Sequence, residues 1–171
     1  DKTCVDENTY DDGHWTLHTK AAPAAPAGVN IAPLGKATQS TTAYNGVASR
    51  AIDGNTDGVY SVADGSVTHT SGPKSWWQVA LDATYQINDI RIYNRTGSRE
   101  EVLLRLNQFS VEILEDGQVV KSFGPFQAFS EDYFDVPGVN GATGNKVRIS
   151  IPGHYLSLAE VEVYGELAKG G

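Results

Sequence analysis

One short polar loop, Asp53–Asp57, carries residue types that suit metal chemistry. Its sequence, DGNTD, places carboxylate and amide oxygens close together, and these are the ligands that a hard cation such as Ca²⁺ prefers. Asp, Asn and Gly also dominate ordinary turns, because they satisfy hydrogen bonds locally. The ligand spacing is not that of an EF-hand loop, so the residues alone leave both a turn and a calcium site open.

A second pair of possible metal ligands, His14 and His18, lies near the start of the chain. Residues four apart share a face of a helix, so on a helix the pair could bind a metal. Gly13 and the scattered aspartates around the pair argue against a helix there. We therefore favour a mobile tail, or the end of a preceding module, over a metal site.

The elements that must position any site are β-strands. Several segments alternate apolar and polar residues with the period of half-buried strands: Asp89–Tyr93, Phe109–Ile113, Lys146–Ile151 and Ala159–Val163. Turn signals separate them, at Glu115–Gly117, Pro137–Gly138 and Pro152–Gly153. The helix-like stretch Glu100–Arg105 is too short to be more than a turn within a loop. The pattern predicts an all-β fold, a β-sandwich.

Composition divides the chain into three parts. Residues 1–28 read as a polar tail followed by a Pro/Ala linker, residues 29–167 as the sandwich domain, and residues 168–171 as a C-terminal tail. The chain begins with Asp and contains no Met, which predicts a processed product or a piece of a longer protein.

Charge and composition argue against several classes of partner. Thirteen basic and twenty-one acidic residues give a net charge of −8, which disfavours nucleic acid and anionic lipid. No apolar stretch is long enough for a membrane helix, so we expect no membrane insertion. The single cysteine, Cys4, permits no internal disulfide. Hydrolase, zinc-protease and phosphate-loop motifs are absent from the sequence, so we expect no enzymatic activity.

Three segments together resemble a known family: Arg50–Asp57, Ser75–Asp82 and Tyr155–Gly165. In this order they are similar to the discoidin-like (coagulation factor type C) galactose-binding-like domains. This group includes carbohydrate-binding module families 32 and 47 and the F-type lectins (fucolectins). The resemblance implies a discoidin-like jelly-roll β-sandwich that binds carbohydrate without catalysis.

The resemblance also implies a structural calcium ion between the polar loop and the penultimate strand. It assigns side-chain carboxylates to Asp53 and Glu160. The neutral ligands would be backbone carbonyl groups and one hydroxyl, from Arg50, Asn55, Ala159 and Ser66. Two carboxylates with neutral oxygens form a ligand set that Ca²⁺ accepts. We expect this ion to tie the loop to the last strands and not to touch ligand.

The same resemblance implies a sugar pocket built from His69, Arg95 and Arg105, with Tyr60 as an aromatic wall. A sugar presents many hydroxyl groups, and arginine offers a rigid planar set of donors for them. Two simpler interpretations stay open. His69 could be an ordinary surface or core histidine. Arg95 could form a solvated ion pair with an acidic neighbour, Asp89, Glu100 or Glu101.

The loop after Arg95 departs from the family pattern. Gly97 stands where the family usually has Asp, the family's adjacent cysteines are absent, and the loop is longer. Arg99 at its tip, together with Lys74, would favour carboxylated or sulfated sugars such as alginate. Trp76 and Trp77 open a strand, so we expect at least one of them to pack in the core.

The sequence therefore predicts a non-catalytic carbohydrate-binding module that captures terminal sugar residues. It would belong to a secreted protein and be fused to a catalytic domain or an adhesin. The alternative is a calcium-stabilised protein- or cell-surface-interaction domain without sugar specificity. A binder of anionic phospholipid is a third possibility, and it would need exposed apolar residues on the loops.

Overall fold

The structure is a computed structural model, and it describes residues 5–11, 14–19, 25–26, 28–60, 65–97 and 99–170. Nearly all regular structure in these residues is antiparallel β-sheet. The elements in chain order are β1 (Val5–Asp11), β2 (His14–Thr19), β3 (Val29–Asn30), the 3₁₀ helix η1 (Ala32–Leu34), β4 (Lys36–Gln39), the 3₁₀ helix η2 (Ala48–Ile52), β5 (Ser75–Asn94), α1 (Glu100–Leu103), β6 (Phe109–Glu115), β7 (Gln118–Phe126), β8 (Phe134–Asp135), β9 (Ala142–Ile151) and β10 (Leu158–Leu167).

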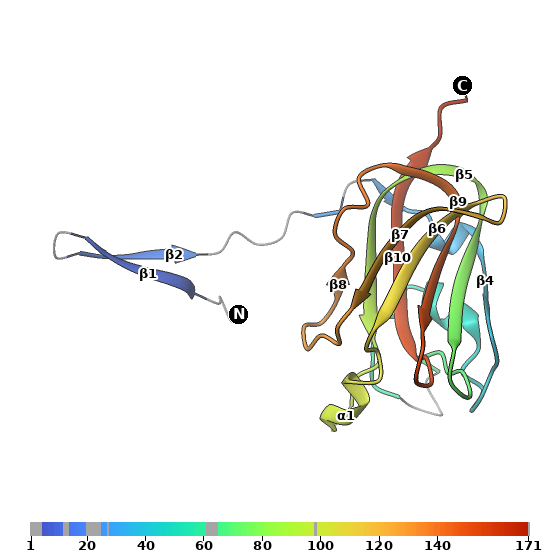
Figure 1. The fold of residues 1–171 in the computed structure, drawn as a ribbon, viewed down its shortest axis with the longest axis horizontal. Helices are drawn as coiled ribbons and strands as arrows, with labels where there is room; N and C mark the ends of the chain where they lie inside the picture. Colours follow the sequence, from blue (N-terminus) through green and yellow to red (C-terminus); the bar gives the residue numbers. More distant parts are fainter. Residues whose placement is uncertain are drawn as a thin grey trace.

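Strand β5 joins the two layers of the sandwich. Its first part, Ser75–Ala80, pairs with β4 and β9, and its second part, Tyr85–Asn94, pairs with β10. Figure 1 shows β5 rising on one side of the domain, arching over the end near the C-terminus and descending on the other side. Both ends of β5 therefore lie at the opposite end of the sandwich, where α1 is also found (Figure 1).

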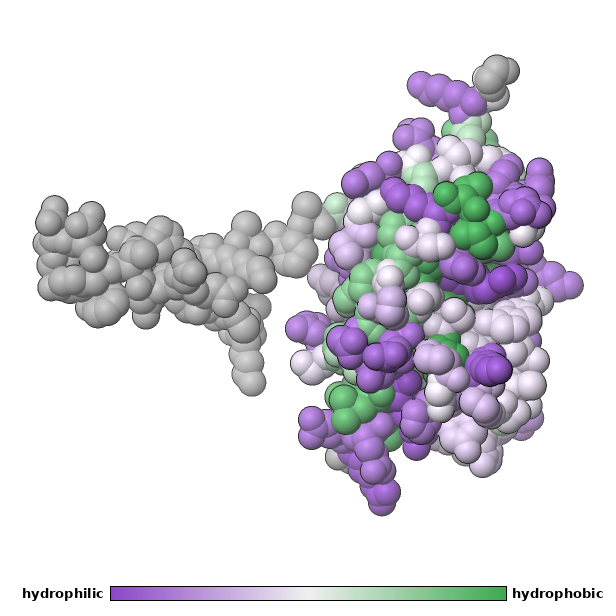
Figure 2. All heavy atoms as spheres, in the orientation of Figure 1, coloured by the Kyte–Doolittle hydropathy of each residue, from purple (hydrophilic) through white to green (hydrophobic). Residues whose placement is uncertain are grey.

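The strand order explains why the fold closes around one core. Strands are bonded in the order β3-β10-β5-β9-β6-β7, and β4 and β8 also pair with β5. Alternate residues of these strands face inward. On one inward face, neighbouring positions of β5, β9 and β6 are occupied by Trp77, Ile149 and Val111. All three side chains are fully buried. On the face seen in Figure 2, hydrophilic and neutral side chains predominate, with apolar ones between them.

The two adjacent tryptophans have different roles. Trp77 is 0% exposed, and its indole N–H donates a hydrogen bond to the Ala48 carbonyl at 3.0 Å. Trp76 is half-buried and faces outward, with the guanidinium carbon of Arg148 5.7 Å from its ring centroid. The expectation that at least one of the two packs in the core is confirmed.

The fold predicted from the sequence is confirmed. All four alternating segments lie within strands, in β5, β6, β9 and β10, and the helix-like stretch contains the single turn α1. None of the described helices is long and apolar enough to cross a membrane.

The N-terminal segment contains a β-hairpin. Strands β1 and β2 pair antiparallel, with His14 opposite Asp11 and His18 opposite Glu7. The two histidines thus lie on a strand, where residues four apart are separated by about 13 Å, more than twice the spacing along a helix. Cys4 and most of the Pro/Ala linker lie outside the described residues.

The buried row across the sheet gives a stability prediction. Replacing Ile149 with alanine removes a fully buried side chain between two other buried residues. We expect a loss of about 2–5 kcal/mol, seen as a fall in Tm of roughly 5–15 °C by calorimetry. Val119→Ala on β7, where the side chain is 48% exposed, is the matched control and should change stability by about 0.5 kcal/mol or less. Equal losses in both variants would contradict this account of the core.

Candidate functional site

His69 is held by hydrogen bonds on both sides of its backbone. Its N–H donates to the Gly46 carbonyl at 2.8 Å, and its carbonyl accepts from the Ala43 N–H at 2.9 Å. The threonines before and after His69 each donate a backbone N–H to the carbonyl of a leucine, Thr68 to Leu158 and Thr70 to Leu156. The hydroxyl group of each threonine accepts a hydrogen bond from the backbone N–H of the same leucine. Successive side chains of an extended segment point to opposite faces, so the His69 ring faces away from both threonines.

Three tyrosine rings surround the His69 ring. The centroid of Tyr44 lies 5.0 Å from that of His69, Tyr155 lies at 5.7 Å and Tyr60 at 6.5 Å. Tyr44 is 73% exposed and Tyr155 is 42% exposed, whereas His69 is only 5% exposed. The imidazole therefore forms the floor of a hollow, and the tyrosines form its walls.

A strained turn brings Tyr44 to the site. Tyr44 and Asn45 both have positive φ, 51° and 56°, and the Gly46 N–H donates to the Ala43 carbonyl at 2.9 Å. These are the features of a type I′ turn. The next residue, Gly46, has to be glycine, because a Cβ there would lie 2.4 Å from the backbone nitrogen of His69.

The two arginines come from the ends of one loop. Arg95 follows β5, and its guanidinium carbon lies 4.6 Å from the centroid of the Tyr60 ring. Arg105 follows α1. The buried side chain of Asn94 donates a hydrogen bond to the Leu103 carbonyl at 3.1 Å, which closes the loop at its base. This bond brings the segments that carry Arg95 and Arg105 close together.

These groups line one pocket of about 540 Å³. None of the described residues that line it is acidic: they are Ala43, Tyr44, Tyr60, His69, Thr70, Ser71, Arg95, Arg105 and Tyr155. The structure thus brings together four of the predicted ligand-binding residues.

The surroundings of His69 favour a neutral ring with one defined tautomer. Burial lowers the pKa of its imidazole, and the positive charges of Arg95 and Arg105 lower it further, against the opposing effect of the Thr70 carbonyl. Nδ1 lies 2.6 Å from that carbonyl, which can only accept, so Nδ1 carries the proton. In a neutral ring Nε2 then keeps a lone pair and can accept a hydrogen bond from a ligand.

Arg95 is a partly desolvated donor. Burial, and then the charge of Arg105, lowers the pKa of its guanidinium. Its Nε is buried and has no hydrogen-bond partner among the described residues. A buried donor without a partner is costly, and a ligand acceptor would satisfy it. The pocket can therefore accept a hydrogen bond at His69 and donate several from the arginines.

Two predicted ligand-binding residues lie outside this pocket. Arg99 is exposed on the loop and pairs with Glu101, with 3.4 Å between the nitrogen and oxygen. Lys74 has a positive φ of 56° and lines a different hollow, beside Gln108 and Pro125. Neither cation is among the residues that line the pocket around His69.

Two tyrosines of the pocket were missed by the sequence reasoning, Tyr44 and Tyr155. The Tyr-Asn-Gly sequence of the first is a turn signal, and the second follows the predicted Pro152–Gly153 turn. Turn signals mark loops but do not say which loops meet, so neither residue could be placed at the pocket.

The polar loop 53–57 is folded by successive Asx turns. The side-chain oxygens of Asp53, Asn55 and Asp57 each accept from the backbone N–H two residues further on, at 2.9, 3.0 and 2.9 Å. These bonds use side-chain oxygens and none of the backbone carbonyl groups. The turn geometry is therefore compatible with a cation held by carbonyl oxygens.

Glu160 is the buried carboxylate beside this loop. It is 0% exposed, Oε1 accepts from the Gly54 N–H at 3.0 Å, and Oε2 has no partner among the described residues. Burial raises its pKa to about 7, and the charges of Asp53 and Glu162 add to this rise against the Gly54 hydrogen bond. A cation here would coordinate the unpartnered Oε2 and offset the repulsion between the carboxylates. The donor set therefore fits Ca²⁺.

The remaining predicted calcium ligands lie in the polar loop, in η2, directly before Glu160 and at the buried residue Ser66. Ser66 is buried, and its hydroxyl donates to the Val59 carbonyl at 2.7 Å. Ala159 is buried directly before Glu160, and Arg50 lies in η2, which leads into the loop. The described residues hold no cluster of three or more His, Cys, Asp or Glu side chains suited to a metal. A site with two carboxylates and otherwise neutral oxygens would not form such a cluster.

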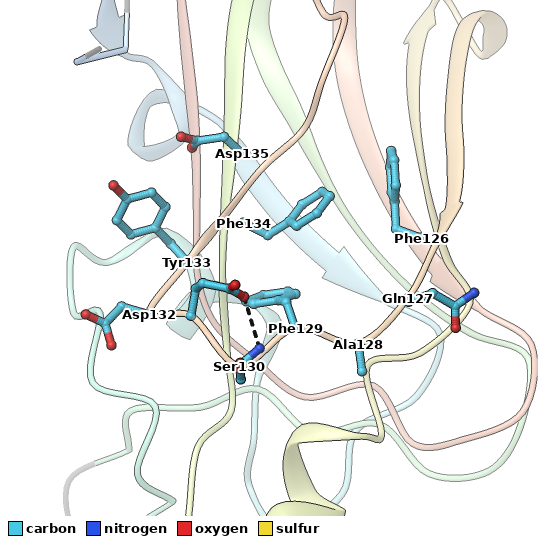
Figure 3. A pocket seen from close by; sticks show the side chains of 10 residues that line it. Phe126, Gln127, Ala128, Phe129, Ser130, Asp132, Tyr133, Phe134 and Asp135 are labelled. Carbon is cyan, nitrogen blue, oxygen red and sulfur yellow. Dashed lines mark hydrogen bonds between the residues drawn. The ribbon is translucent and has the colours of Figure 1, made fainter. Parts of the chain in front are cut away.

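A larger hollow of about 720 Å³ lies in the loop between β7 and β8 (Figure 3). Its floor is made of phenylalanine rings in contact, with centroids 4.9 Å apart for Phe126 and Phe134 and 5.4 Å for Phe129 and Phe134. One of its three lining carboxylates, Asp135, pairs with Arg91 at 2.7 Å. We interpret this hollow as the open side of the aromatic core.

The fold and the pocket together define a class of protein. A discoidin-like β-sandwich with a pocket of histidine, arginine and tyrosine side chains between its end loops is a lectin-type carbohydrate-binding domain. The chain belongs to the F5/F8 type C family: residues 50–151 match the family model of the NedA-like, galactose-binding domain. The resemblance seen in the sequence is confirmed.

Relatives and solved structures agree with this assignment. Fucolectin-3 of Anguilla japonica is 45% identical over 71 residues, which cover 39% of this chain and 38% of the fucolectin. The match thus spans well under half of that curated relative. The lectin domain of Lectinolysin, solved with Lewis B antigen, is 35% identical with a TM-score of 0.72, covering 82% of this chain and 98% of that one. The Streptococcus pneumoniae fucose binding module SpX-3 is 37% identical with a TM-score of 0.70, covering 80% and 97%.

The state of His69 can be tested directly. We expect a titration followed by NMR to place the pKa of His69 below 6.5, with Nδ1 protonated in the neutral ring. Because the pKa is lowered on folding, the unfolded chain binds the His69 proton more tightly than the folded chain does. The neutral imidazole therefore contributes to folding stability above pH 6.5, and this contribution is lost as the pH falls below 6.5. A pKa above 6.5, or a proton on Nε2, would contradict the assignment of Nε2 as the acceptor.

Proposed function

We propose that the chain captures a terminal fucose-type sugar residue of a glycan. The observation that carries this proposal is the convergence of neutral His69 with Arg95 and Arg105 in one pocket. A sugar hydroxyl both donates and accepts hydrogen bonds, so one hydroxyl can serve Nε2 of His69 and a guanidinium at once. The similar fucolectin and fucose binding module, both named for fucose, support the same sugar.

The tyrosine walls add an apolar contact. A 6-deoxy sugar has a methyl group and an apolar ring face, both of which pack well against aromatic rings. Tyr44 and Tyr155 present exposed rings beside His69 for this purpose. The pocket is open and small, so we expect single-site affinity to be weak.

Fucose is favoured over the uronic acids considered from the sequence. That expectation depended on Arg99 and Lys74, and both lie outside the pocket. Two arginines without an acidic neighbour among the described lining residues can still pair with a carboxylate. Uronate-rich glycans such as alginate fragments therefore belong in the same experiment.

The biological role follows from binding without catalysis. In a secreted protein, such a domain would hold an attached enzyme or adhesin near its glycan and so raise its local concentration. We retain attachment to a second domain and secretion as parts of the proposal.

We also propose that a Ca²⁺ ion bound by Asp53, Glu160 and neighbouring neutral oxygens stabilises the fold. The support is the buried Glu160 oxygen without a partner, next to a second carboxylate. When bound, the ion would neutralise this charge pair. The loop, η2 and β10 would then be held together.

The sugar proposal is tested by Arg95→Ala on a glycan array with fucosylated, galactosylated and uronate-rich oligosaccharides. We expect the wild type to bind fucosylated glycans and Arg95→Ala to bind at least about 10-fold more weakly, because hydrogen bonds to a charged group are lost. Arg99→Ala removes an arginine from the same loop outside the pocket, so it is the matched control and should bind as the wild type does.

Other array results would change the proposal. Selective binding to uronates that depends on Arg95 would replace fucose with an anionic sugar. No binding to any glycan by folded protein would contradict the sugar proposal and favour the interaction domain without sugar specificity.

The calcium proposal is tested by thermal unfolding with calcium and with a chelator. At a calcium concentration about 100-fold above its dissociation constant, binding should add about 2.7 kcal/mol, which raises Tm by roughly 5–10 °C. An unchanged Tm would contradict the proposal.

Glu160→Gln provides the matched variant. In chelator at pH 8, the wild type carries a buried negative charge, because the pKa of Glu160 is about 7. The stability contributed by the protonated form is present at low pH and lost as the pH rises through 7. We therefore expect Glu160→Gln to be at least as stable as the wild type in chelator, and less stable than the wild type in calcium.

A further inference from the structure

Residues 53–60, which we call the strap, run from the proposed calcium site to the sugar pocket. At one end the Gly54 N–H bonds to buried Glu160, and the successive Asx turns fix the backbone up to Val59. At the other end Tyr60 lines the pocket beneath Arg95. The two sites therefore share one continuous segment of chain.

The strap is bonded to the residue that follows Arg95. The Thr96 N–H donates to the Gly58 carbonyl at 2.8 Å, and Val59 and Thr96 form a parallel β-bridge. The Val59 carbonyl in turn accepts from the buried Ser66 hydroxyl at 2.7 Å. These bonds fix the backbone on one side of Arg95 relative to the strap.

Gly58 is the point of closest approach. A Cβ there would lie 2.6 Å from the Asn94 carbonyl oxygen and 2.8 Å from the Thr96 hydroxyl oxygen. Asn94 and Thr96 are the neighbours of Arg95 on either side. Any side chain at residue 58 must therefore displace the backbone that carries Arg95, because a backbone oxygen cannot move away as a flexible side chain can.

We propose that Gly58 is a positioning residue for Arg95, and that the strap couples calcium occupancy to sugar affinity. The proposal rests on the proposed function for its ligand. Calcium fixes the strap at Glu160, the strap fixes Thr96 through Gly58, and this places the Arg95 guanidinium over Tyr60. Coupling between two binding sites is reciprocal, so sugar should tighten calcium binding by the same factor.

The test compares Gly58→Ala with Gly97→Ala by titration with a fucosylated oligosaccharide at saturating calcium. Gly97 lies on the same loop, and a Cβ there would meet only Val102 at 3.9 Å, which is ordinary contact. We expect Gly58→Ala to bind about 10-fold more weakly than the wild type, and Gly97→Ala to bind within about 2-fold of it. Equal affinities for folded Gly58→Ala and Gly97→Ala would overturn the positioning role.

A second measurement uses the wild type alone and does not depend on the folding of a variant. The sugar dissociation constant is measured in calcium and in chelator, and the calcium dissociation constant with and without sugar. We expect both to tighten by the same factor, about 5-fold or more. A change below 2-fold in either constant would overturn the coupling.

A readout without sugar separates this inference from the proposed function. The Arg95 Nε–H resonance should shift when calcium is added to the wild type, and should shift less in Gly58→Ala. If no glycan binds but this pattern is seen, the sugar proposal fails and the positioning role stands. If glycan binds but the resonance does not respond to calcium, the coupling fails and the sugar proposal stands.

Discussion

The pairing of β10 with the second half of β5 is the interaction on which both sites depend. It places Leu158 opposite Asn94 and Glu160 opposite Tyr93. Arg95 therefore emerges next to the segment that holds His69, and buried Glu160 faces the polar loop. Backbone hydrogen bonds within a sheet tolerate little sliding, because a shift of one residue reverses every side chain. The register of one strand pair thus fixes the relative position of the candidate pocket and the proposed calcium site.

Both sites retain polar groups that the fold itself does not satisfy. In the pocket, Arg95 has a buried donor without a partner among the described residues, and a second cation is close enough to lower its pKa. Beside the polar loop, Glu160 on β10 has a buried oxygen without a partner among the described residues, near another carboxylate. Such groups lower stability, and they persist where a ligand completes them. Arg95 offers an unpaired donor and positive charge, which suits a sugar hydroxyl or an anion. Glu160 offers an unpaired acceptor and negative charge, which suits a cation.

The sequence predicted the strands well and the site in part. Alternation defined β5, β6, β9 and β10 because each buries one face, and resemblance identified His69, Arg95, Arg105 and Tyr60, which the structure brings into one pocket. Position in a loop gives no side-chain direction, so Lys74 and Arg99, which were added where the loop departs from the family pattern, were assigned to a pocket that they do not line. Tyr44 reaches that pocket by a turn with two positive φ angles, and periodicity does not report such a turn.

The hydrogen bond from Asn94 to the Leu103 carbonyl closes the arginine loop at its neck. The neck, together with the bond from Thr96 to Gly58, holds the backbone segments that carry Arg95 and Arg105 near each other, whatever the length of chain between them. Residues 97–102 are therefore free to lengthen, shorten or change in sequence during evolution while both arginine-bearing segments stay at the pocket. Under the proposed function, divergence in this loop would alter which neighbouring glycan residues are tolerated. The longer loop of this chain is an example of such variation, and the same segment is a natural place to graft new selectivity.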